Sequence, residues 1–165
     1  ETSLPGVYAI GDAVGGMMLA HAASAQGLTV VHAIAGEEAP LCLDAIPACV
    51  YVSPEIASVG LTQADCQQRG IEVKVGKALM GANGRTLIAG GQRGFIKVVV
   101  SAENGRVLGA QLMCERATDM IDSFTVAIAN GLTATQLMRA VRPHPTFLEA
   151  VGEALDALEG RAIHS

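Results

Sequence analysis

The chain is organised around the segment Arg142-Pro143-His144-Pro145-Thr146-Phe147-Leu148-Glu149, which lies near the end of its 165 residues. Prolines on both sides of His144 restrict the backbone, so the imidazole is held in place rather than carried on a free loop. Thr146 and Glu149 have the T-x-x-E spacing of a helix capping box. This spacing predicts a helix over residues 146–158, with the Glu149 carboxylate in its first turn.

Two interpretations of Glu149 follow from these residues alone. In the structural one, the carboxylate only completes the capping box, and His144 is an ordinary loop residue. In the functional one, the carboxylate accepts a hydrogen bond from one ring nitrogen of His144 and fixes its tautomer, so that the other nitrogen can exchange protons near neutral pH. Such a pair can perform general acid/base catalysis, but it needs a nucleophile from elsewhere.

The same segment resembles the C-terminal signature of the flavin-dependent pyridine nucleotide-disulfide oxidoreductases. Further matches follow in the family's order at residues 7–13 (VYAIGDA), 18–21 (MLAH) and 46–60 (IPACVYVSPEIASVG). The likeness covers nearly the whole chain. It is greatest to the branch of the family that oxidises dihydrolipoamide.

The resemblance implies two domains. Residues 1–40 would be a strand and helix left from an α/β FAD-binding domain, and residues 41–165 would be an α+β dimerisation domain. Asp12 resembles the family's aspartate that binds the ribityl chain of FAD, although the residue alone also suits a turn or a helix N-cap. The segment that approaches the flavin ring is matched by Leu19, Ala20, His21 and Ala22.

In the second domain, the resemblance implies that His144 takes a proton from a dihydrolipoamide thiol across the interface of a homodimer, and that Glu149 holds and polarises this histidine. The substrate would be carried by a lipoyl-bearing acyltransferase or carrier protein, and its electrons would pass to FAD and then to NAD. The sequence lacks a Gly-rich FAD fingerprint, an NAD-binding Rossmann unit and a pair of cysteines separated by four residues. We therefore expect the chain to be the C-terminal part of a longer enzyme and to be inactive alone.

Two other functions stay open. One is another disulfide reductase of the family, of the glutathione-reducing kind; residues 19–21 (LAH) favour the lipoamide branch, because the glutathione-reducing branch differs here. The other is a purely structural dimerisation module in which His144 is inert. The upstream sequence would be decisive for the first of these alternatives.

Composition excludes several classes of protein. The chain is 50% hydrophobic and 3% aromatic, with a net charge of −5, so it offers neither the positive surface nor the aromatic platforms that bind nucleic acids. Residues 13–36 carry no charged side chain, yet polar residues such as Gln26 and Thr29 favour a buried helix over a membrane span. The opening glutamate and the turn at Pro5-Gly6 give no sign of a signal peptide.

The cysteines have neither C-x-x-C spacing nor a histidine at the spacing of a zinc ligand. We interpret them as buried or partly buried thiols in a reducing compartment, the cytoplasm, and we expect no metal site. They are Cys42, Cys49, Cys66 and Cys114.

Hydrophobic periodicity and turn residues predict the order of the elements. Strands are expected at residues 7–10, 46–52, 57–61, 71–79, 94–101 and 106–113, the last two forming a hairpin. Helices are expected at residues 17–35, 62–69, 118–130, 133–141 and 146–158, and loops at 81–84 and 90–91. This order predicts an α+β fold with one antiparallel sheet covered by helices on one side. From the resemblance, the peptide bonds before Pro54 and Pro145 are expected to be cis.

Overall fold

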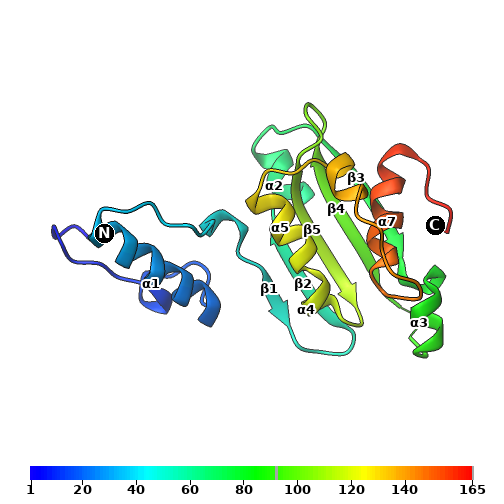
Figure 1. Ribbon diagram of the computed structural model, residues 1–165, viewed down its shortest axis with the longest axis horizontal. Helices are drawn as coiled ribbons and strands as arrows, with labels where there is room; N and C mark the ends of the chain where they lie inside the picture. Colours follow the sequence, from blue (N-terminus) through cyan, green and yellow to red (C-terminus); the bar gives the residue numbers. More distant parts are fainter. Residues whose placement is uncertain (92, 165) are drawn as a thin grey trace. The chain divides into compact units, whose positions relative to one another are not determined.

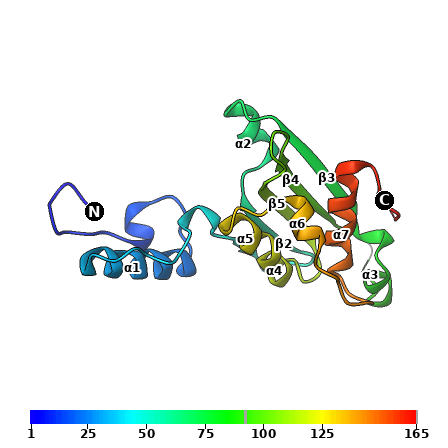
Figure 2. The same ribbon diagram turned by 45° about the horizontal axis from the view of Figure 1, so that its top comes forward.

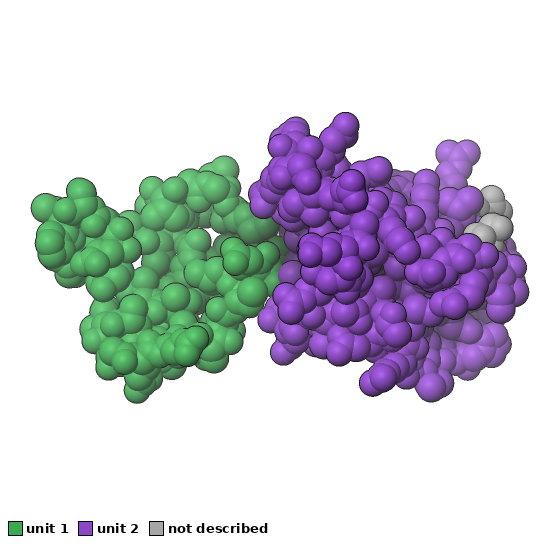
Figure 3. Space-filling model, turned by 90° about the horizontal axis from the view of Figure 1, so that it is seen from above, with its two compact units in different colours: residues 1–46 green, residues 47–165 purple. Residues whose placement is uncertain are grey.

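The computed structural model describes residues 1–91 and 93–164. The chain forms two compact units, Glu1–Ile46 and Pro47–Ser165 (Figure 3). The second unit begins six residues after the expected start at residue 41. That the first unit is the end of a flavin-binding domain stays a prediction.

The first unit is built on one long helix, α1 (Ala20–Ala35), with the 3-10 turns η1 (Gly11–Val14) before it and η2 (Leu43–Ala45) after it. The backbone N–H of Gly11 donates to Oε1 of Gln26 at 2.7 Å, which ties η1 to the helix. The helix begins three residues later than predicted and ends as predicted at residue 35.

Residues 7–10 form no strand, so this prediction was wrong. They have the apolar character of a strand, but a strand is stable only when a neighbour satisfies its backbone N–H and C=O groups. Within the described part of the first unit, no such neighbour is present. The apolar run therefore stays an irregular segment.

The second unit contains one five-stranded antiparallel sheet in the order β1-β2-β5-β4-β3 (Figure 1). β4 and β5 form the predicted hairpin, with Val98 opposite Ala110. The prediction of an α+β fold with an antiparallel sheet is confirmed. The strands are β1 (Ala48–Val50), β2 (Glu55–Gly60), β3 (Val73–Leu79), β4 (Phe95–Ser101) and β5 (Val107–Cys114).

Helices cover one face of this sheet (Figure 2). α4 (Ala117–Met120) and α5 (Asp122–Ala129) pack on β2 and β5, while α7 (Glu149–Asp156) packs on β3 and β4. Alternate residues of the strands point toward these helices and form the hydrophobic core with them. Its largest fully buried side chains are Phe124, Met80, Ile96, Leu112 and Leu155.

A glycine lets α7 lie close against β3. A Cβ atom at Gly76 would overlap the backbone carbonyl oxygen of Ala154 in α7, so only a residue without a side chain allows this approach. Since α7 begins with Glu149, this contact helps to set the position of the candidate carboxylate over the sheet.

Two short helices begin with capping boxes, close to the expected helix starts at residues 62 and 133. In α2 (Gln63–Gln68), Thr62 and Asp65 exchange backbone and side-chain hydrogen bonds, and in α6 (Ala134–Met138), Thr133 and Gln136 do the same. Both cis peptide bonds are also confirmed, before Pro54 and before Pro145.

One loop prediction and one helix prediction were wrong. The loop expected at residues 81–84 instead contains parts of the 3-10 turn η3 (Met80–Ala82) and of the helix α3 (Gly84–Ile88). The helix expected at residues 118–130 is divided into α4 and α5 at Ile121. The carbonyl oxygen of Ile121 accepts hydrogen bonds from the N–H groups of Phe124 and Thr125, which tightens the turn where the two helices meet.

All four cysteines are free thiols. Cys66 and Cys114 are buried and Cys49 is half-buried, as expected, but Cys42 is exposed, contrary to the expectation. Burial raises the pKa of the Cys114 thiol to about 12. Among the residues that the structure describes, no helix combines the length and the apolar character needed to cross a membrane.

Candidate active site

The candidate site lies where the loop of residues 143–148 enters α7. The helix begins at Glu149, three residues later than predicted, and the expected capping box forms only in part. The Thr146 hydroxyl donates to the carbonyl oxygen of Pro143 at 2.7 Å instead of accepting from the N–H of Glu149. The other half is present, because the Thr146 N–H donates to Oε2 of Glu149 at 2.9 Å.

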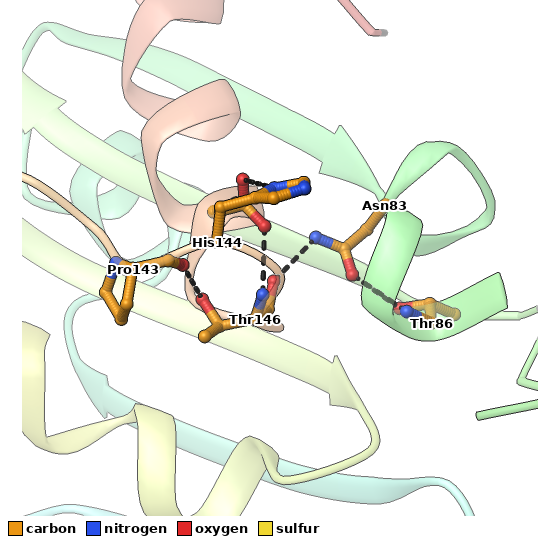
Figure 4. A network of polar contacts seen from close by, with 6 residues as sticks. Asn83, Thr86, Pro143, His144 and Thr146 are labelled. Carbon is orange, nitrogen blue, oxygen red and sulfur yellow. Dashed lines mark hydrogen bonds and ion pairs between the residues drawn. The ribbon is translucent and has the colours of Figure 1, made fainter. Parts of the chain in front are cut away.

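The Glu149 carboxylate uses its two oxygens for two partners. Oε2 accepts from the backbone of Thr146, and Oε1 lies 2.9 Å from Nδ1 of His144 (Figure 4). The structural and the functional interpretation of Glu149 are therefore not exclusive. One oxygen holds the loop, and the other contacts the imidazole.

The charge state of Glu149 fixes the direction of its bond to His144. The pKa of Glu149 is held below its ordinary value, first by the hydrogen bond from the Thr146 N–H and then by the one from His144. The carboxylate is therefore ionised at neutral pH and can only accept. Nδ1 of His144 must donate, so in the neutral ring the lone pair lies on Nε2, pointing away from the carboxylate.

The imidazole is open to other molecules. The His144 side chain is 78% exposed and that of Glu149 is 31% exposed. A pocket of about 310 Å³ lies beside the pair, with an apolar wall from the end of β3, η3 and the start of α7. Residues of this wall include Ala78, Leu79, Ala82 and Ala150.

Asn83 also belongs to the site, and it was missed from the sequence. Its Oδ1 accepts hydrogen bonds from Thr86 at the start of α3, and its Nδ2 donates to the carbonyl oxygen of Thr146 at 3.0 Å (Figure 4). The Asn83-x-x-Thr86 spacing is that of an N-cap, which could have revealed α3. Nothing in the sequence indicates the contact with Thr146.

The residues predicted to contact a flavin lie in the first unit. Asp12 is exposed and lies in η1, and Leu19 is the N-cap of α1. Ala20, His21 and Ala22 form the first turn of that helix. The structure thus places these residues at one helix N-terminus and the turn before it, but their role in binding a cofactor stays a prediction.

A second histidine–glutamate pair serves as a reference for the first. Nδ1 of His32 lies 3.0 Å from Oε2 of Glu37, with the same separation of five residues as in the His144 pair. His32 lies in the last turn of α1, and Glu37 follows the C-cap Gly36 of that helix. Among the described residues, no group of three or more histidine, cysteine or acidic side chains is arranged to hold a metal ion.

Comparisons with known proteins agree with this architecture. Residues 46–155 match the pyridine nucleotide-disulphide oxidoreductase dimerisation domain. The chain is 42% identical to a dihydrolipoyl dehydrogenase of Zymomonas mobilis, over 99% of its own length and 36% of that protein. It is 44% identical to one of Chlorobaculum tepidum, over 96% of its own length and 34% of that protein.

Solved structures show the same relationship. LpdA from Mycobacterium tuberculosis superposes with a TM-score of 0.85 and 28% identity, over 92% of this chain and 33% of that one. The chain spans about a third of the length of the relatives that it matches. On the match to residues 46–155 and the identity to these relatives, the chain belongs to the pyridine nucleotide-disulphide oxidoreductase family.

Proposed function

We propose that the chain is the C-terminal part of a flavin-dependent dihydrolipoyl dehydrogenase, in which His144 and Glu149 form the acid/base pair. The whole enzyme would convert dihydrolipoamide and NAD to lipoamide and NADH. The observation that carries the proposal is the 2.9 Å contact between His144 and Glu149 on an exposed ring. The names of the relatives from Zymomonas mobilis and Chlorobaculum tepidum support the choice of substrate.

The His144–Glu149 pair would supply the base that a thiol needs to become a thiolate at neutral pH. The nucleophile in disulfide exchange is a thiolate, whereas a thiol with an ordinary pKa of about 8.5 is mostly protonated at pH 7. Nε2 of His144 would take the proton of one dihydrolipoamide thiol as its sulfur attacks a disulfide in the N-terminal part of the enzyme. Glu149 would keep Nδ1 protonated and stabilise the charged ring that results.

FAD and NAD are the cofactors that the family implies. For FAD, the first unit offers the exposed Asp12 carboxylate and the N-terminus of α1, where the N-cap Leu19 contributes no side-chain hydrogen bond. A carboxylate suits the hydroxyl groups of a ribityl chain, and helix N–H groups suit an electron-rich carbonyl, so these residues fit part of a flavin site. When bound, FAD would accept the electron pair from the substrate. We assign no residue of this chain to NAD.

We also propose that the enzyme is a homodimer assembled through the second unit. The matching family domain is a dimerisation domain, and large side chains are exposed along and after the edge strand β1, at Val50, Tyr51 and Val52. Light scattering on the chain at micromolar concentration is expected to give twice the mass of 16.9 kDa. Salt screens interactions between charges but does not weaken apolar contacts, so the mass of the dimer should persist at high ionic strength. A mass of one chain would contradict assembly through this part.

The proposed partner of the enzyme is a lipoyl-bearing acyltransferase or carrier protein, which would deliver dihydrolipoamide to the exposed imidazole. The four free thiols fit a reducing compartment, which we propose to be the cytoplasm.

The proposal is tested by the substrate preference of the full-length enzyme. NADH formation from dihydrolipoamide and NAD is expected, with glutathione disulfide a poor substrate in the reverse direction. Preference for glutathione disulfide would instead favour the glutathione-reducing branch.

A further inference from the structure

We propose that Asn83 is a positioning residue for the His144–Glu149 pair. From the start of α3, its side chain would fix the Thr146 peptide group and, through it, the carboxylate that orients the imidazole. The catalytic consequence rests on the function proposed above, whereas the contacts stand on the structure alone.

The imidazole needs positioning because packing does not supply it. With 78% of its side chain exposed, His144 is not held by a surrounding core. Among the described residues, the polar contact recorded for its ring is the one to Glu149. The orientation of the ring therefore depends on how firmly the Glu149 carboxylate is held.

The Glu149 carboxylate is held in turn by Thr146. Its Oε2 accepts the Thr146 N–H at 2.9 Å, so any movement of this backbone segment moves the acceptor for Nδ1 of His144. The Thr146 hydroxyl is engaged by the carbonyl oxygen of Pro143, within the same loop. The loop thus contains its own local bonds, but these do not attach it to the rest of the fold.

Asn83 makes a polar attachment to the rest of the fold, across 63 positions of sequence. Asn83 is only 8% exposed. Oδ1 faces two donors, the N–H and the hydroxyl of Thr86, at 2.9 and 3.1 Å, so the Nδ2 group must face the carbonyl oxygen of Thr146. An amide that is 8% exposed regains little hydrogen bonding from water when it loses this acceptor, which makes the contact costly to break.

A second contact between the same two segments restricts the loop further. The Arg85 guanidinium lies over the ring of Phe147, 5.8 Å from its centroid. The short helix α3 therefore contacts two consecutive residues of the loop, and the contact from Asn83 is to the one whose N–H binds Glu149. Through these two contacts, α3 and its N-cap hold the loop that carries the His144–Glu149 pair.

The competing explanation is that Asn83 only caps α3. Two substitutions separate the two roles. Asn83→Ser keeps a good N-cap acceptor but is too short to reach Thr146. Thr86→Val is the matched control, because it removes one donor on the capping side and leaves the bond from Asn83 to Thr146 in place.

In the full-length enzyme, Asn83→Ser is expected to lower kcat with dihydrolipoamide by about ten- to a hundredfold, with KM changed by less than about twofold, because displacement of a catalytic group costs rate. Thr86→Val should keep kcat within about twofold of wild type. A crystal structure of Asn83→Ser gives a readout that does not depend on turnover. The Nδ1–Oε1 contact of His144 and Glu149 should be broken or present in only part of the molecules.

Wild-type kcat together with an intact His144–Glu149 contact in Asn83→Ser would overturn the inference. If Asn83→Ser does not fold, Asn83→Asp replaces it, since this variant keeps the cap and the side-chain size and replaces the donor to Thr146 by a carboxylate oxygen, which repels the Thr146 carbonyl oxygen. The proposed function is judged separately by His144→Ala. Should that variant retain turnover, the function fails, while the crystal structure still decides whether Asn83 positions the ring.

Discussion

Replacing His144 by alanine in the full-length enzyme is expected to lower dihydrolipoamide turnover by about 10²–10⁴, the usual contribution of a positioned base. The side chain is 78% exposed, so its removal takes away no core packing and should leave the fold intact. FAD should stay bound, because the residues proposed to contact it lie in the first unit. NADH formation measures the rate, and the absorbance of the flavin measures the bound cofactor.

The pH dependence of this loss distinguishes a base from a structural residue. A substrate thiol ionises by itself once the pH exceeds its pKa of about 8.5. The deficit of His144→Ala should therefore shrink as the pH rises toward that value. A deficit that stays constant with pH would argue that the substitution disturbs the site in another way.

The matched control is His32→Ala. This histidine has the same contact with a glutamate five residues later, at 3.0 Å, but it lies in the last turn of α1, without the loop and pocket of the candidate site. Turnover should stay within about twofold of wild type. Full activity in both variants would mean that the His144 pair is structural and that only a dimerisation module remains.

The parts of this fold that sequence predicted depend on local signals. The turn at Asn104-Gly105 predicts the hairpin of β4 and β5, and it forms because the residues that shape it are adjacent in the chain. The capping boxes at Thr62 and Thr133 form for the same reason. At Thr146 only half of the capping box forms, because the Thr146 hydroxyl donates to the nearby carbonyl oxygen of Pro143.

The parts that were missed depend on neighbours that are distant in sequence. Residues 7–10 look like a strand, but a strand needs a partner that the described chain does not supply. In the candidate site, His144 and Glu149 could be paired from their spacing, because five residues separate them. Asn83 could not be assigned, because its contact with Thr146 spans 63 positions and involves only the backbone of its partner.

Glu149→Gln is expected to lower dihydrolipoamide turnover by about ten- to a hundredfold, less than the loss of the base itself. The Thr146 N–H requires an acceptor, so the amide oxygen of glutamine should turn toward it and leave the NH₂ group facing Nδ1 of His144. Nδ1 must then accept, which places the proton of the neutral ring on Nε2. That tautomer cannot take a proton from the substrate, and the size of the loss is limited because solvent can reach the exposed ring.

Thermal unfolding of the same variant tests the second role of the carboxylate. The pKa of Glu149 is lower in the folded chain than its ordinary value of 4.5, first because of the Thr146 N–H and then because of His144. The ionised group therefore stabilises the fold above about pH 4.5, and this contribution is lost as the pH falls through the lowered pKa. The difference in Tm between wild type and Glu149→Gln should be largest near neutral pH and should close in acid. A Tm difference for Glu149→Gln that is constant across this pH range would show that the charge of Glu149 does not hold the loop. The control for turnover is Glu37→Gln in the reference pair, which should keep turnover at the wild-type level.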